Sequence, residues 1–194
     1  MAALCPEVLR ASHACGKLGR TQPAAATMGW GVMNELVTDL LYEVVDKLKG
    51  DIQRKDCPAI VAIDGTKQLV IRDYDYLRDR ETAVDFERRA ATRARELDVV
   101  RWVLAVPQVW VIDARGGIKT RAVSNLPLRE GEEEAITWTA YDRDDGLDIG
   151  RVFYTRRPSG APIFDEPEIV TRQGQMSENA PGHVLLQSVI AADE

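Results

Sequence analysis

The run VVRWVLAVPQVWVID, residues 99–113, constrains the fold of this chain more than any other segment. It holds eleven apolar residues, two of them tryptophans, and Pro107 interrupts it. A proline cannot donate to a strand ladder, so prolines in sheets lie at edges or bulges. We therefore expect a core strand that bends or bulges at Pro107 and offers an edge to a partner.

The two tryptophans of this run, Trp102 and Trp110, share a face only if Pro107 leaves the strand register unchanged. A bulge would turn one of them to the opposite face, where an exposed tryptophan marks a partner surface. Trp102, Pro107 and Trp110 are therefore the predicted partner surface. The alternative is that they pack in the core, as aromatic residues on strands usually do.

Residues 34–50 carry the clearest helical pattern. Asn34 is the predicted N-cap, and Gly50 suits the position just after the helix. Apolar residues at alternating spacings of one and three form a single stripe of a 3.6-period helix. The stripe consists of Leu36, Val37, Leu40, Leu41, Val44, Val45 and Leu48.

A second helix is predicted over 79–98, with Asp79 as its cap. Two short strands should precede it, joined at Asp64-Gly65, because this dipeptide accepts positive φ in a hairpin turn. Further strands are predicted at IKTRAV, AITWTAY and GRVFYT, and DRDDG reads as the hairpin turn between the last two. The stripe of the second helix consists of Ala83, Phe86, Ala90, Ala94 and Leu97.

This order predicts an α+β domain over 34–170, with two amphipathic helices packed on one face of a mostly antiparallel sheet of about five to six strands. Residues 1–33 are rich in Ala and Gly, and we expect a disordered or non-native extension, with a transit peptide as the alternative. Residues 171–194 should form a mobile C-terminal tail. Within this tail, HVLLQSVI could form a late element or a docking segment.

Composition excludes several classes of protein. The apolar fraction of 45% and charged fraction of 29% fit a soluble globular protein, and the longest apolar runs are too short for a membrane span. A net charge of −6 disfavours binding to nucleic acid. The three cysteines form neither a disulfide framework nor a C-x-x-C pair, so we expect a cytoplasmic protein.

The histidines, His13 and His183, both fall in the predicted tails. A histidine base, a Ser-His-Asp triad or a His-rich zinc site is therefore not expected inside the domain. The sequence also lacks the Walker, dinucleotide-binding and G-x-S-x-G motifs. We expect no cofactor and no catalytic residue of these kinds.

Carboxylates are the remaining candidates for chemistry. Asp64, Asp73, Asp75 and Glu81, with Asp79 among them, lie close in sequence and would hold Mg²⁺ if they converged within about 4 to 6 Å. The alternative is a hairpin turn followed by a helix start rich in capping acids. The acidic run EGEEE, residues 130–134, is likewise expected to be a solvated loop that enters a strand.

About half of the chain resembles a loose group of short bacterial and phage-encoded proteins. Their pattern is an Arg/Glu-rich helix, an apolar strand with a tryptophan, a Pro-x-Arg segment with Glu-Ala, and a hairpin that ends in an arginine and a glycine turn. The resemblance implies the α+β fold and a bacterial or prophage origin, and it implies no activity. The matching residues here are Trp110, Pro127, Arg129, Glu134, Ala135, Arg156 and Gly160.

The sequence therefore predicts a non-enzymatic accessory or assembly domain that self-associates through an edge strand or binds another protein. The alternative is a metal-dependent hydrolase or nuclease that uses the carboxylates between Asp64 and Glu81. A third hypothesis is a small-molecule pocket between the helices and the sheet.

Overall fold

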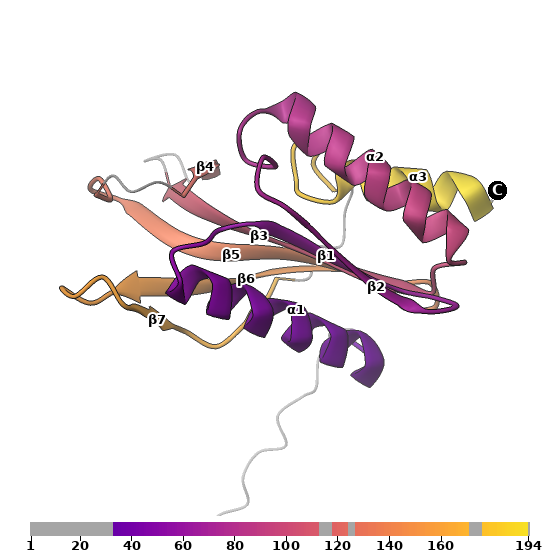
Figure 1. Cartoon of the computed structure of the whole chain (residues 1–194), viewed down its shortest axis with the longest axis horizontal. Helices are drawn as coiled ribbons and strands as arrows, with labels where there is room; N and C mark the ends of the chain where they lie inside the picture. The colour runs from indigo at the N-terminus through magenta and orange to yellow at the C-terminus, as the bar shows by residue number, and fades with distance from the viewer. Residues whose placement is uncertain (1–32, 113–117, 124–126, 171–175, 194) are drawn as a thin grey trace, which may run out of the picture. The chain divides into compact units, whose positions relative to one another are not determined.

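The computed structural model describes residues 33–112, 118–123, 127–170 and 176–193. These residues form three helices and an antiparallel sheet, as the predicted α+β class requires (Figure 1). The elements are α1 (Glu35–Gln53), β1 (Ala59–Asp64), β2 (Gln68–Asp73), α2 (Arg80–Glu96), β3 (Arg101–Ile112), β4 (Ile118–Ala122), β5 (Glu132–Asp142), β6 (Gly146–Arg156), β7 (Pro162–Phe164), β8 (Glu168–Ile169) and α3 (His183–Asp193).

The strands follow the order β2-β1-β3-β5-β6-β7, with β4 paired to β3 and β8 paired to β6. Every pairing is antiparallel. The tryptophan-bearing strand β3 pairs with β1, β4 and β5, so it lies inside the sheet. The expectation of a partner edge on this strand is therefore corrected.

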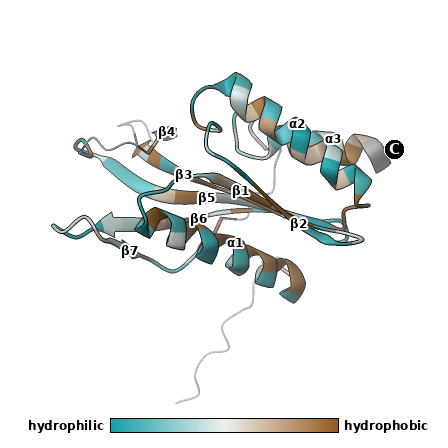
Figure 2. Ribbon diagram, viewed as in Figure 1, coloured by the Kyte–Doolittle hydropathy of each residue, from teal (hydrophilic) through white to brown (hydrophobic). Residues whose placement is uncertain are grey.

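The helices cover both faces of the sheet. The buried residues of α1 cluster with one face, which includes Val103, while those of α2 and α3 cluster with the other, which includes Trp102. The two predicted helices thus lie on opposite faces (Figure 1) and not together on one. Burial of both faces explains the continuous apolar runs 59–63 in β1 and 102–106 in β3, because a strand with one wet face would alternate. Figure 2 shows this hydrophobic part of the sheet between α1 and α2.

Helix α1 begins as predicted, because the Asn34 side chain accepts a hydrogen bond from the Val37 N–H at 2.9 Å. Six residues of the predicted stripe are buried, and Leu36 is 59% exposed. The helix continues past Gly50 and ends at Gln53, so Gly50 is a helical residue and not the terminating one.

The turn after Asp64 needs glycine for a reason other than the predicted positive φ. Gly65 passes so close to the end of α2 that a Cβ there would lie 2.2 Å from the Leu97 carbonyl oxygen. The Thr66 N–H donates to that same oxygen at 2.7 Å. The glycine therefore permits a close backbone approach.

Strand β3 passes through Pro107 without a bulge. Its pairing with β5 keeps one register from Arg101 to Val111, so Trp102 and Trp110 share a face. Pro107 falls after Ala105, the last residue paired with β1, and before Gln108, the first paired with β4. A proline is tolerated there because β3 has a neighbouring strand on one side only.

The end of the chain is ordered where a mobile tail was expected. Residues 183–193 form α3, which buries Leu185, Leu186 and Val189 in the cluster that contains α2. At the other end, the prediction for residues 1–33 lies outside the described residues except for Met33, whose side chain is buried against α1. Within the described ranges, every helix is too short or too polar to cross a membrane.

Candidate functional site

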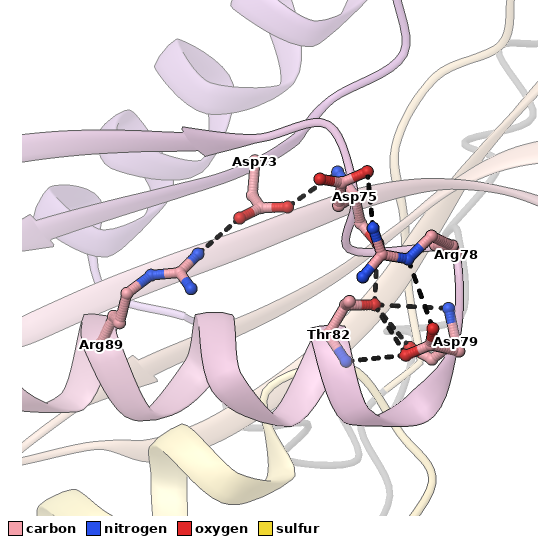
Figure 3. A network of polar contacts seen from close by, with 6 residues as sticks. All are labelled: Asp73, Asp75, Arg78, Asp79, Thr82 and Arg89. Carbon is pink, nitrogen blue, oxygen red and sulfur yellow. Dashed lines mark hydrogen bonds and ion pairs between the residues drawn. The ribbon is translucent and has the colours of Figure 1, made fainter.

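Most of the acidic residues proposed as a metal site bind arginines, and the Asp73 carboxylate also accepts the Asp75 N–H at 2.8 Å. Asp73 accepts a hydrogen bond from Arg89 at 2.5 Å, and Arg78 lies 3.5 Å from Asp75 (Figure 3). Asp79 caps α2 by accepting the Thr82 N–H at 2.8 Å, which confirms the predicted cap. These contacts are typical of a turn followed by a capped helix start, which was the alternative to a metal site.

The remaining acids of that set lie elsewhere. Asp64 and Asp73 occupy opposite ends of the β1–β2 hairpin, roughly 16 Å apart along the strand. Asp64 binds Arg101 at 2.6 Å, and Glu81 is exposed on α2. Nowhere in the described part of the chain do three His, Cys, Asp or Glu residues gather as metal ligands would. The convergence that a metal-dependent hydrolase requires is therefore not provided by these carboxylates.

Two of the three residues expected at a partner surface lie inside the fold. Trp102 has no exposed area, and its ring stacks on Tyr141 with centroids 5.9 Å apart. Pro107 is also buried. Trp110 alone keeps part of its surface exposed, so only this residue can contact a partner in the present fold.

Trp110 belongs to a small cluster of side chains on the sheet, which we call the aromatic patch: Trp110, Arg151 and Phe153. The two rings meet edge to face with centroids 5.9 Å apart. The Arg151 guanidinium lies over both, 5.1 Å from the Trp110 ring and 4.5 Å from the Phe153 ring. Contacts of this kind hold an arginine and two aromatic rings in place before any partner arrives.

Neighbouring side chains hold the aromatic patch in place. The Trp110 Nε1–H donates to Thr137 Oγ1 at 2.9 Å, and Arg151 forms an ion pair with Glu168 at 2.9 Å. Glu133 lies directly opposite Trp110 in the register and therefore on the same face. It is exposed and, among the residues that the structure describes, has no ion-pair partner. The aromatic patch and the two glutamates beside it thus combine partly exposed rings with charges of both signs.

The aromatic patch lies beyond the helices. Neither core cluster contains Trp110 or Phe153, although both rings stand on the face that α2 and α3 cover further along the strands. Both rings are half-buried by neighbouring strands and side chains. Among the described residues, both rings therefore keep part of their surface accessible.

The acidic run at 130–134 enters β5 directly, and two of its carboxylates are buried. Arg121 binds both oxygens of Glu132, and the Arg129 N–H donates to one of them at 2.9 Å. The hydrogen bonds from Arg121 and then from the Arg129 N–H lower the pKa of Glu132 to about 2. The expectation of a solvated loop is corrected at this residue.

Glu134 makes a second ion pair of the same kind. Arg156 donates to both of its oxygens, at 2.7 and 2.8 Å, and the Tyr154 hydroxyl donates at 3.3 Å. Burial is the main cause that raises the pKa of the Tyr154 hydroxyl, and the negative charge of Glu134 is the second. Glu134 and Arg156 are therefore partners across β5 and β6, which gives both residues a structural role.

A cavity of about 310 Å³ lies between the start of α2, the start of α3 and the β3–β4 strands. His183, Glu87 and Tyr76 line it. The expectation that both histidines lie in tails, away from the fold, is thus corrected for His183, while His13 lies outside the described residues. The third hypothesis placed a pocket between the helices and the sheet, but the sequence could not name its residues, because part of the wall comes from the segment before α3, which shows no periodic pattern.

The chain matches no protein-family model, no curated protein and no solved structure. Its site must therefore be interpreted from its own geometry.

Proposed function

We propose that this protein is a non-enzymatic assembly domain that associates with a second copy of itself through the aromatic patch. The supporting observation is the pair of partly exposed rings, Trp110 and Phe153, on a sheet face outside both core clusters. Trp and Arg dominate the binding energy of protein interfaces because they bury large, pre-ordered surfaces. The association uses this face of the sheet, since β1, β4 and β5 occupy both sides of β3 except at Val106 and Pro107.

A second copy suits the aromatic patch because positive and negative side chains lie side by side there, so two identical surfaces can pair opposite charges. Arg151 carries a positive charge, and Glu133 and Glu168 on the same part of the sheet carry negative ones. In a two-fold interface the same surface of both copies is in contact, so every contact between two different residues occurs twice, once in each direction. Arg151 of one copy can then meet the unpaired Glu133 of the other. This arrangement pairs opposite charges at two symmetric positions.

The experiment is light scattering coupled to size exclusion over a range of protein concentrations. The wild type should approach twice the mass of one chain as concentration rises. Arg151→Glu should remain monomeric, because it places two carboxylates opposite one another and removes the cation from the rings. Arg88→Glu, an exposed arginine of α2 that lies next to Asp85, is the matched control and should associate as the wild type does.

The proposal fails if the wild type stays monomeric at all concentrations. It also fails if Arg151→Glu and Arg88→Glu associate equally well. Circular dichroism of each variant establishes that the fold is intact before the masses are compared.

A further inference from the structure

The cavity between α2, α3 and the sheet has an inner wall of buried polar side chains. Tyr76, Glu87 and Gln108 are buried there, while His183 is half-buried. The mouth of the cavity is lined by three exposed charged residues, Asp79, Arg80 and Glu178. A cavity of about 310 Å³ has the volume of roughly ten water molecules. It lies at the lower end of the size range of small-molecule sites.

The wall of this cavity is fixed by Glu87. One carboxylate oxygen accepts the Tyr76 hydroxyl at 2.7 Å and the Gly182 N–H at 2.9 Å. The other accepts the N–H groups of Val184 and Leu185, at 2.8 and 3.2 Å. The Pro181 carbonyl oxygen accepts the Thr139 hydroxyl at 2.8 Å. The cavity is therefore formed before a ligand enters, and its shape does not depend on one.

Two polar atoms at this cavity lack a hydrogen-bond partner. Gln108 is only 6% exposed, yet its Oε1 has no partner among the described residues. His183 Nδ1 is buried in the same way. A buried polar group without a partner destabilises the fold, so most such groups in proteins are satisfied. A ligand that donates hydrogen bonds would satisfy the Gln108 oxygen.

The charge of the inner wall favours a cation. Glu87 is buried, and among the described residues its hydrogen bonds come only from neutral donors. The N-terminus of α3 compensates about half of one charge. The Arg121 guanidinium, which borders the cavity, already binds Glu132. The inner wall thus keeps a net negative charge, which favours a cation over carboxylates and phosphates, and the mouth adds Arg80 together with two acids, Asp79 and Glu178.

We infer that this cavity binds a small organic amine, a molecule that carries an ammonium group and donates hydrogen bonds to Gln108. A metal ion is the less suitable cation, since no group of three His, Cys, Asp or Glu ligands occurs among the described residues. An ammonium group needs acceptors and a negative potential. The Gln108 oxygen and His183 Nδ1 supply the acceptors, and the charge of Glu87 supplies the potential. The site is separate from the aromatic patch, so its occupancy does not depend on self-association.

The test is isothermal titration calorimetry of the full chain at neutral pH with three probes of equal carbon number. Putrescine carries ammonium groups, butanediol carries hydroxyl groups, and succinate carries carboxylates. Putrescine should bind with a saturable isotherm. Butanediol should bind about tenfold more weakly or worse, because it loses the charge, and succinate should give no saturable heat.

Gln108→Leu then tests the predicted contact. It should weaken putrescine binding by roughly tenfold while leaving the melting temperature unchanged or higher, because it removes a buried amide oxygen that has no partner among the described residues. Gln53→Leu, an exposed glutamine at the end of α1, is the matched control and should bind as the wild type does. His183→Ala provides a second variant in the same wall, with the same expected loss of binding.

Three results would overturn the inference. The first is the absence of saturable binding of putrescine to the wild type. The second is succinate binding as tightly as putrescine, which would contradict the charge argument. The third is full affinity in both folded cavity variants, Gln108→Leu and His183→Ala, which would place any bound amine elsewhere.

Discussion

Glu87 accepts a hydrogen bond at 2.8 Å from the backbone N–H of Val184, although 97 residues separate them in sequence. The carboxylate lies at the start of α3, where helical N–H groups have no partner within their own helix. The buried Glu87 carboxylate accepts two of these N–H groups, those of Val184 and Leu185, and also the N–H of Gly182. The position of α3 on the sheet therefore depends on one side chain of α2.

Glu87→Ala should consequently lower the free energy of unfolding by about 2–4 kcal/mol, because several buried donors lose their acceptor at once. Hydrogen exchange should accelerate first in α3. Urea titration and amide exchange measure both effects. Glu81→Ala, an exposed residue in the first turn of the same helix, should cost less than about 1 kcal/mol. An equal loss for the two variants would show that Glu87 does not hold α3.

Two glycines should respond in opposite directions to the same substitution. Gly50→Ala should raise the free energy of unfolding by about 0.5–1 kcal/mol, because this glycine is inside α1 and the nearest atom to an added Cβ is 3.6 Å away. Gly65→Ala should lower it by about 1–3 kcal/mol or more, because the Cβ would overlap the Leu97 carbonyl. Calorimetric melting of the two variants measures the difference. A destabilising Gly50→Ala would indicate that α1 ends at residue 50 after all.

The Glu132–Arg121 pair should make stability depend on pH. The pKa of Glu132 is about 2 in the folded chain and 4.5 in its ordinary state. Because the folded value is the lower one, the unfolded chain takes up the proton first, and stability falls as pH decreases from about 4.5 towards 2. Glu132→Gln should be less stable at neutral pH and should lose less stability across this range.

Denaturant unfolding at a series of pH values checks this dependence. Glu130→Gln is the control, since Glu130 is exposed in the preceding turn. It should follow the wild-type curve. Parallel curves for wild type and Glu132→Gln would contradict the assignment of this acid response to Glu132.

Local structure could be predicted from sequence because local patterns determine it. The Asn34 cap, the stripe of α1 and the hairpin between Asp142 and Gly146 all depend on residues a few positions apart. The placement of elements could not be predicted in the same way. Pro107 indicated an edge, yet the unbroken apolar run around it was the signal of a central strand with two buried faces.

The candidate sites depend on contacts between distant residues, and this limited their prediction. Glu87 lies on the buried side of α2, where its charge is compatible with burial only because α3 supplies donors. Glu134 and Arg156 become partners only through the register of β5 and β6. The acids between Asp64 and Glu81 are close in sequence, but the hairpin separates them and nearby arginines bind them.

In the proposed dimer, two copies meet through their aromatic patches, and Arg151 of each copy lies opposite Glu133 of the other. Mixing Arg151→Glu with Glu133→Arg tests it most directly, because each variant alone places like charges in contact, whereas the mixture restores opposite charges at both symmetric positions. Light scattering should show each folded variant as a monomer and the mixture at twice the mass of one chain. A mixture that stays monomeric while the wild type associates would contradict this arrangement.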